Sequence, residues 1–201
     1  MKKVAIFGSN GMLGSALVRQ YKNDDSVNLL TPTRKELDLT DNQATFDWFL
    51  KNMPNEVYMA AGDVGGIEYN KDNNLTLLHR NMIMTQNVIN SSHCCDVERL
   101  IYFASSCCYP KDISQPMSED MLMSDKLEPT NEGYALAKLI GIKLCEYYTK
   151  EYYNRNFISV LPCNLYGPGD NYDKKSSHVV AALIRKVLSE TVIEVWGTGR
   201  S

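Results

Sequence analysis

Short apolar runs alternate with longer segments of helical periodicity along most of this chain. In residues 12–21, for example, Leu13, Ala16, Leu17 and Tyr21 recur at the spacing of one helix face. The predicted strands are residues 3–7, 27–30, 57–61, 100–104 and 157–161. The predicted helices are residues 12–21, 44–51, 77–91, 134–153 and 178–190, and a further strand follows at 192–196. This alternation predicts an α/β fold: a doubly wound parallel sheet of the Rossmann type, with helices on both faces and right-handed crossovers.

A glycine-rich turn joins the first predicted strand to the first helix, in the sequence Gly8-Ser-Asn-Gly-Met-Leu-Gly14. In such a turn the first glycine allows the sharp bend, the second lets backbone amides approach a pyrophosphate, and the third lets helix and strand pack closely. The helix N-terminus then holds the anion. We therefore predict a dinucleotide site formed by Gly8, Ser9, Asn10, Gly11, Met12, Leu13 and Gly14. The alternative is that the glycines serve only the turn.

The residues after the second strand bear on the choice of cofactor. Enzymes that use NAD usually place an acidic residue there to bind the ribose 2′-hydroxyl. This chain instead has Arg34 and Lys35, which favours NADP(H) because a guanidinium would bind the 2′-phosphate. Glu36 keeps NAD open, and the two basic residues could be solvated surface charges. Asp38 and Leu39 stand where a contact to adenine is expected, and Asp63 follows the third strand near the nicotinamide path.

Tyr134 and Lys138 are four residues apart, so they share one face of a predicted helix. A nearby ammonium lowers the pKa of a phenol, and Ser105 upstream would polarise a carbonyl that receives a hydride. Alone, this spacing is a weak signal, because many amphipathic helices place Tyr and Lys in this way. The glycine turn and Ser105 strengthen it to a predicted hydride-transfer site.

Composition narrows the class of protein further. The chain has 201 residues, 44% of them hydrophobic, and a net charge of −3, with no basic block that would indicate nucleic acid or a membrane surface as partner. No apolar stretch is long enough to span a bilayer, and we expect a cytoplasmic protein. Neither adjacent pair of cysteines has the spacing of a metal or redox site, so we expect five of the six to be buried and Cys107 to be the exception.

Taken together, these motifs resemble the extended short-chain dehydrogenase/reductase family and, within it, the GDP-L-fucose synthase family. The closer resemblance lies in Ser105-Ser-Cys-Cys-Tyr-Pro-Lys111, Gln115-Pro-Met117, Leu127-Glu-Pro-Thr-Asn-Glu132, Gly141-Ile-Lys-Leu-Cys-Glu146, Asn164-Leu-Tyr-Gly-Pro168 and Ser177-His-Val179. It implies NADPH-dependent 3,5-epimerisation and 4-reduction of GDP-4-keto-6-deoxy-D-mannose. Cys107 would act as base and His178 as acid in epimerisation, and Tyr134, Lys138 and Ser105 would serve the reduction.

The resemblance also implies contacts to substrate and a division of the chain. Asn164 would lie on the nicotinamide side and, with Ser106, His178, Lys186 and Trp196, would contact the GDP-sugar. Lys186 stands where the family usually has an arginine for the diphosphate, and a lysine cannot form the bidentate fork. Residues 1–163 would form the NADP-binding domain with the catalytic residues, and 164–201 the start of a substrate-binding region that looks truncated.

Two other functions stay open at this stage. One is a related NAD-dependent nucleotide-sugar epimerase or dehydratase, and the other is a non-catalytic dinucleotide-binding remnant. The family commonly dimerises through the helices that correspond to 77–91 and 134–153, so a homodimer is expected.

Overall fold

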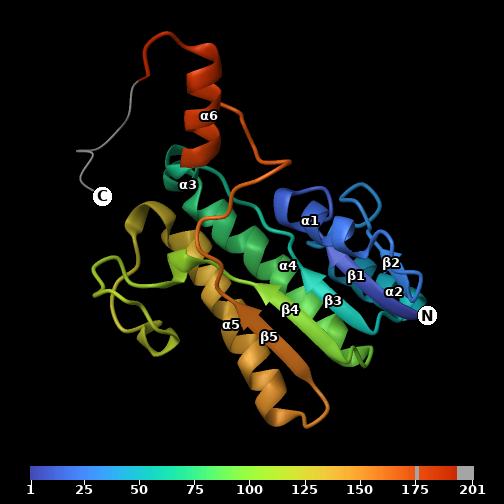
Figure 1. Ribbon diagram of the computed structural model, residues 1–201. Helices are drawn as coiled ribbons and strands as arrows, with labels where there is room; N and C mark the ends of the chain where they lie inside the picture. The colour runs from blue at the N-terminus through green and yellow to red at the C-terminus, as the bar shows by residue number, and fades with distance from the viewer. Residues whose placement is uncertain (175–176, 194–201) are drawn as a thin grey trace.

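Five parallel strands form one sheet at the centre of the molecule (Figure 1). The computed structural model describes residues 1–174 and 177–193. The strand order is β2-β1-β3-β4-β5, and each neighbouring pair runs parallel. The strands are β1 (Lys2–Phe7), β2 (Val27–Leu30), β3 (Glu56–Met59), β4 (Arg99–Phe103) and β5 (Asn156–Val160). The predicted fold class and all five of these strands are confirmed, with ends that shift by no more than two residues.

The helices cover both faces of the sheet, as predicted. Helices α2 (Asn42–Asn52), α4 (Asn74–Cys94) and α5 (Glu132–Glu151) pack side by side on one face. Helix α1 (Met12–Tyr21) lies on the other face, against β1 and β2. Helix α6 (Val179–Ser189) stands away from the sheet, near the end of the chain (Figure 1). The crossovers leave every strand's carboxyl end at the same edge of the sheet, where ligands bind in open α/β folds.

The main core lies between the sheet and the layer of α2, α4 and α5. Strand residues of alternating position, such as Ala5 and Phe7, point into it because side chains alternate across a pleated strand. Phe7 packs edge-on against Trp48, with ring centroids 5.2 Å apart. Thr149 of α5 is hydrogen-bonded to the edge strand β5. Its hydroxyl accepts from the Phe157 N–H and donates to the Phe157 carbonyl, both at 3.0 Å. This core fixes the carboxyl edge on which the predicted site residues lie.

Some expectations are wrong. The sequence analysis missed α3 (Ile67–Asp72), because six residues with an exposed Ile67 show no helical periodicity. Val192 and Ile193 are not in a strand, and the rest of predicted strand 192–196 lies outside the described residues. Cys95, Cys108 and Cys145 are buried as expected, but Cys94 and Cys163 are exposed. Cys94 ends α4 on its solvent side, and Cys163 lies beyond β5, so neither faces the core.

The polar segment between β4 and α5, residues 109–131, is mostly loop and is interrupted by short 3₁₀ turns. These are η2 (Glu119–Met121) and η3 (Pro129–Asn131), and a third, η1 (Ser106–Cys108), precedes the segment. Among the described helices, none is both long enough and apolar enough to cross a membrane.

Candidate cofactor and active site

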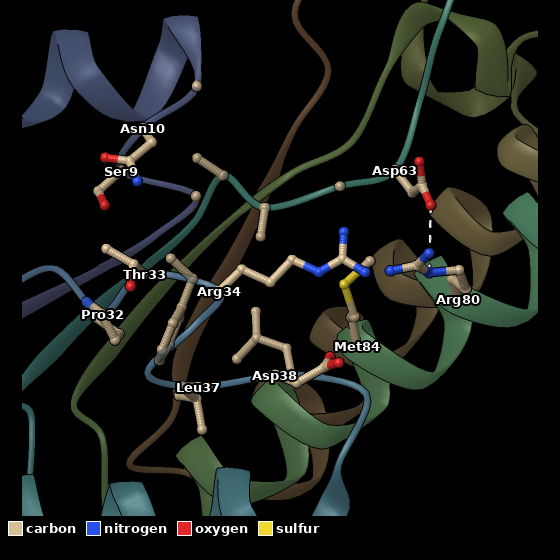
Figure 2. Close-up of a pocket in the computed structure, with 17 residues that line it drawn as sticks. Ser9, Asn10, Pro32, Thr33, Arg34, Leu37, Asp38, Asp63, Arg80 and Met84 are labelled. Carbon is tan, nitrogen blue, oxygen red and sulfur yellow. Dashed lines mark ion pairs between the residues drawn. The ribbon is translucent and has the colours of Figure 1, made fainter.

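A cavity of about 290 Å³ opens at the carboxyl edge of the sheet (Figure 2). Its walls come from four places: the glycine turn after β1, the loop after β2, the segment after β3, and one face of α4. The lining residues that were predicted to bind cofactor are Gly8, Ser9, Asn10, Gly11, Arg34, Asp38, Leu39 and Asp63. Its volume lies near the lower end of the range for small-molecule sites, about 300–1,000 Å³.

The glycine turn is held in a conformation that requires glycine. Gly8 has φ +82, and its carbonyl accepts from the Gly11 N–H at 3.0 Å. A Cβ on Gly14 would lie 2.0 Å from the Gly8 carbonyl oxygen, so Gly14 lets α1 sit directly against the turn. Met12, Leu13 and Gly14 form the first turn of α1 and do not line the cavity. Gly11 and the N-terminus of α1 are thereby aimed at the cavity, as an anion site requires.

The loop after β2 directs the side chains of Arg34 and Glu36 to different places. Arg34 lines the cavity, and Figure 2 shows its guanidinium extending into it. Glu36 is instead turned back, because its carboxylate accepts from the Thr33 N–H and the Thr33 hydroxyl, both at 2.8 Å. These same hydrogen bonds hold the pKa of Glu36 below its usual value. Of these two side chains, the positively charged Arg34 is therefore the one that reaches the cavity.

Asp38 and Leu39 form the floor beyond Arg34. The Thr40 N–H and hydroxyl both donate to Asp38 and hold its pKa below the usual value, with smaller contributions from Arg34 and Arg80. The Leu39 carbonyl accepts from the Asn87 side chain at 2.9 Å, which anchors this stretch to α4.

The sequence analysis missed the contribution of α4 to this cavity. Arg80 and Met84, four residues apart on α4, both line it. Arg80 pairs with Asp63, with 3.3 Å between Nε and Oδ2. Next to it the buried Asn81 side chain accepts from the Asp63 N–H and donates to the Asp63 carbonyl, both at 2.8 Å. A buried asparagine on a helix is the one sequence signal that could have pointed to this packing.

The start of α5 carries Tyr134 and is tied to the α3–α4 junction. Asn74 Oδ1 accepts from the Gly133 N–H at 2.7 Å, and Asn70 donates to Asn131 at 2.8 Å. A Cβ on Gly133 would lie 2.1 Å from the Asn74 carbonyl oxygen. The Asn70 side chain also accepts from the Gly65 N–H at 3.0 Å, so one residue joins the segment after β3 to the N-terminus of α5.

Tyr134 and Lys138 are both buried, and both have shifted pKa values. Lys138 Nζ donates to the Phe103 carbonyl at 2.8 Å and lies 5.6 Å from the centre of the Tyr134 ring. Burial lowers the pKa of Lys138 to about 8. Burial also raises the pKa of Tyr134, with Cys107 and Cys108 adding to the effect and Ser105 opposing it. The expected lowering of the Tyr134 pKa is therefore wrong for this structure, because burial of the phenol is the largest cause and raises the pKa.

Ser105 and Cys107 lie beside this tyrosine. Ser105 follows β4 and begins η1, where its hydroxyl accepts from the Cys107 N–H at 3.2 Å. The turn η1 packs against α5, the helix that carries Tyr134, so the structure brings Ser105 and Cys107 close to Tyr134, and both side chains contribute to the shift of its pKa. Ser106 lies in the same 3₁₀ turn and is half-buried. This group contains a hydroxyl, a thiol and a phenol at the carboxyl edge of the sheet.

The remaining predicted residues lie farther along the chain. Asn164 is exposed in the segment after β5, which then passes the start of α1, with the Cβ position of Gly169 lying 3.6 Å from Ser15 Oγ. His178 is exposed at the N-cap of α6, and Lys186 is half-buried in its last turn. Trp196 lies outside the described residues. Both His178, as the N-cap, and Lys186 belong to α6, which stands away from the sheet (Figure 1).

The cavity suits a dinucleotide. Gly11 has room on its inner side, since a Cβ there would meet only the Gly8 carbonyl oxygen at 3.4 Å. The cavity also offers a helix N-terminus and the projecting guanidinium of Arg34, which together match an anionic ligand. Among the described residues, no group of three or more His, Cys, Asp or Glu could hold a metal ion.

Known proteins agree with this arrangement. The sequence model described as "NAD dependent epimerase/dehydratase family" matches residues 4–201. GDP-L-fucose synthase of Escherichia coli K12 is 44% identical over 98% of this chain and 63% of its own length. GDP-L-colitose synthase of Yersinia pseudotuberculosis is 37% identical over 99% of this chain and 66% of its own length. This chain thus spans a little under two thirds of the length of these relatives.

A solved structure shows the same fold. It is the GDP-D-glycero-L-gluco-heptose synthase of Campylobacter jejuni, determined in the presence of NADPH. Its TM-score is 0.87 at 33% identity, over 92% of this chain and 54% of that one.

Proposed function

Because this chain belongs to the NAD dependent epimerase/dehydratase family and is a homologue of GDP-L-fucose synthases, we propose that it acts on a GDP-sugar with NADPH. The proposed reaction is 3,5-epimerisation and 4-reduction of GDP-4-keto-6-deoxy-D-mannose to GDP-L-fucose. The observation that carries it is the grouping of Ser105, Cys107 and Tyr134 at the sheet edge that also forms the dinucleotide cavity. A thiol in that group is what distinguishes an epimerising reductase from a plain reductase.

The choice of NADP(H) over NAD(H) is supported by the loop after β2. Arg34 reaches the cavity, whereas Glu36 is held by Thr33 and does not line it. A carboxylate at the ribose would favour a 2′-hydroxyl and repel a 2′-phosphate, and a guanidinium has the opposite effect. NADPH was also present with the related heptose synthase.

In the reduction, Tyr134 would donate a proton to the sugar's 4-oxygen. NADPH, when bound, supplies the hydride to C4. The raised pKa of Tyr134 keeps the phenol protonated near neutral pH, so the general acid carries its proton before the reaction. Ser105 would hydrogen-bond the same oxygen, and the Lys138 ammonium would stabilise the tyrosinate left after proton transfer.

In the epimerisation, protons leave and return at C3 and C5. Both carbons adjoin the 4-keto group, so each carbanion is stabilised as an enolate. We assign the Cys107 thiolate as base, because it lies beside the tyrosine that polarises the ketone. The assignment of His178 as the returning acid, and of Ser106, Asn164, Lys186 and Trp196 as sugar-nucleotide contacts, is supported only by the resemblance to the family.

The experiment is to follow NADPH absorbance with GDP-4-keto-6-deoxy-D-mannose. Tyr134→Phe should abolish NADPH oxidation, whereas Tyr153→Phe, a fully exposed tyrosine just beyond the same helix, should leave it unchanged. Full activity in Tyr134→Phe would overturn the mechanism. Turnover of the sugar without net NADPH oxidation would indicate an epimerase, and NADPH binding without any turnover would indicate a non-catalytic binding protein.

Cys107→Ser separates the two half-reactions. We expect it to stop solvent deuterium from entering C3 and C5, with Cys94→Ser as the control because Cys94 is an exposed thiol away from the site. Continued exchange in Cys107→Ser would remove the cysteine from its proposed role.

We also propose a cytoplasmic homodimer in which 1–163 bind the cofactor and 164–201 begin a substrate-binding region. The dimer is supported by apolar side chains that α4 and α5 leave on the surface, namely Ile83, Leu136, Ile140 and Tyr147. Light scattering tests it: Ile140→Glu should yield monomer, and a monomeric wild type would contradict it.

A further inference from the structure

One ion pair in the cofactor cavity has no part in the chemistry described above. It joins Arg80 of α4 to Asp63 after β3, and both side chains line the cavity (Figure 2). The two side chains are 33% and 24% exposed, so the pair is partly shielded from water. Its acidic member lines the same cavity as the glycine turn and Arg34, which suit an anion.

We propose that Arg80 sets the affinity for the dinucleotide by neutralising Asp63, so that the cavity can accept the cofactor's phosphates. This inference rests on the proposed cofactor site. Arg80 would be an affinity-determining residue rather than a catalytic one.

The position of Asp63 makes neutralisation necessary. Asn81 holds the Asp63 N–H and carbonyl at 2.8 Å each, and is itself anchored by donating to the Leu77 carbonyl at 2.8 Å. The backbone from which the Asp63 carboxylate projects is therefore fixed at the cavity wall, and the carboxylate itself is held there by Arg80. The same cavity is lined by Gly8, Ser9 and Gly11, the turn suited to a pyrophosphate. An unpaired carboxylate there would repel a bound polyanion through a partly water-excluded space.

The position of Arg80 makes it effective. The charge of Arg80 acts on the opposite side of the cavity as well. Hydrogen bonds from Thr40 are the main cause of the lowered pKa of Asp38, and Arg34 and Arg80 lower it further by smaller amounts. Figure 2 shows the guanidinium groups of Arg34 and Arg80 entering the same part of the cavity from different walls. Arg34 comes from the loop after β2, on the 2′-phosphate side, whereas Arg80 pairs beside the end of β3. Arg80 should act on NADPH and NADH alike, because its proposed effect is to neutralise Asp63 and not to bind the 2′-phosphate.

A double-mutant cycle tests the proposal, with affinities for NADPH and NADH measured by fluorescence titration. Arg80→Gln leaves Asp63 uncompensated and should weaken both dinucleotides about tenfold, less at high salt. Asp63→Asn frees a cation in the cavity and should tighten both. The double variant should return to within about threefold of wild type, because the two charge changes cancel. Arg99→Gln is the matched control, since Arg99 is exposed at the opposite edge of the sheet.

The direction in which each variant changes the affinity distinguishes charge neutralisation by Arg80 from a purely structural role, in which the ion pair only holds the segment after β3 in place. A purely structural role predicts that Asp63→Asn weakens dinucleotide binding as much as Arg80→Gln does, and that result would overturn the proposal. Unchanged affinity in all variants, or an effect of Arg80→Gln on NADPH alone, would also overturn it. Thermal unfolding midpoints should agree among the variants, because half-exposed ion pairs add little stability. A wild-type chain that binds neither dinucleotide overturns the proposed function as well, whereas a binding wild type with unmoved variants overturns only this inference.

Discussion

The cofactor cavity and the region after β5 differ in the contacts that hold their residues in place. In the cofactor cavity, side-chain hydrogen bonds fix successive backbone segments, as Asn87 does at Leu39 and Asn81 at Asp63. In the region after β5, Ala181 is the one buried residue in α6, and Ile184 and Leu188 are exposed. Eight of the predicted cofactor residues therefore line one cavity, whereas His178 and Lys186 lie on a helix apart from the sheet (Figure 1).

The difference shows which part of the proposed activity this chain's own contacts support. Under the proposed function, a dinucleotide would be bound by the turn at Gly8 and Gly14, by Arg34 and by the start of α1, and the turn and α1 are packed on the sheet. The sugar would in addition be bound by residues of α6, whose apolar side is largely uncovered by the described residues. Cofactor affinity and sugar affinity should therefore respond to different mutations.

The largest expected effect comes from truncating matched leucines in the two regions. Leu77 of α4 is fully buried, and Leu77→Ala should lower the free energy of unfolding by about 2–5 kcal/mol. Leu188 of α6 is 82% exposed, and Leu188→Ala should change it by less than about 0.5 kcal/mol. Urea denaturation measures both. Equal costs would show that α6 is packed as firmly as α4 and would remove the contrast.

The glycine turn provides the next prediction. Gly14→Ala places a methyl group 2.0 Å from the Gly8 carbonyl oxygen, so we expect a loss of about 3 kcal/mol of stability and of NADPH binding. Gly11→Ala meets only a 3.4 Å contact, so stability should hold while the methyl group hinders the approach of the phosphates. Chemical denaturation and NADPH titration separate the two variants. Normal binding by Gly14→Ala would contradict the geometry of the turn.

A smaller effect is expected from the pH dependence of Lys138. Its pKa falls from 10.5 to about 8 in the folded chain, so between these values the unfolded chain binds more protons. Stability should therefore rise with pH across this window, relative to a Lys138→Met variant that lacks the group. Urea midpoints for the two proteins at several pH values test this. Parallel pH profiles would show that Lys138 titrates normally.

The sequence predicted the fold because its signals are local. The helix 12–21 was placed with the observed ends, and helix 134–153 was placed two residues late, since η3 leads directly into α5. Short α3 left no periodic trace. The positions of Gly8, Arg34 and Asp38 followed from the strand–turn–helix order, which sets the carboxyl edge.

The rest of the site depends on tertiary packing. In sequence, Arg80 is one basic residue of a long helix, and only the packing of α4 beside β3 brings it to Asp63. The raised pKa of Tyr134 likewise reflects burial by distant segments, which the four-residue spacing to Lys138 does not report. The placement of His178 depends on how α6 packs, and local sequence does not determine this.

The central claim is that this chain by itself forms a site for NADP(H), selected by Arg34. The most direct test is calorimetric titration of the chain with NADPH and with NADH, repeated for Arg34→Ala and for its exposed neighbour Lys35→Ala. We predict that NADPH binds at least about tenfold tighter than NADH, that Arg34→Ala removes this preference, and that Lys35→Ala keeps it. Equal affinity for the two dinucleotides, or a preference unchanged in Arg34→Ala, would contradict the account.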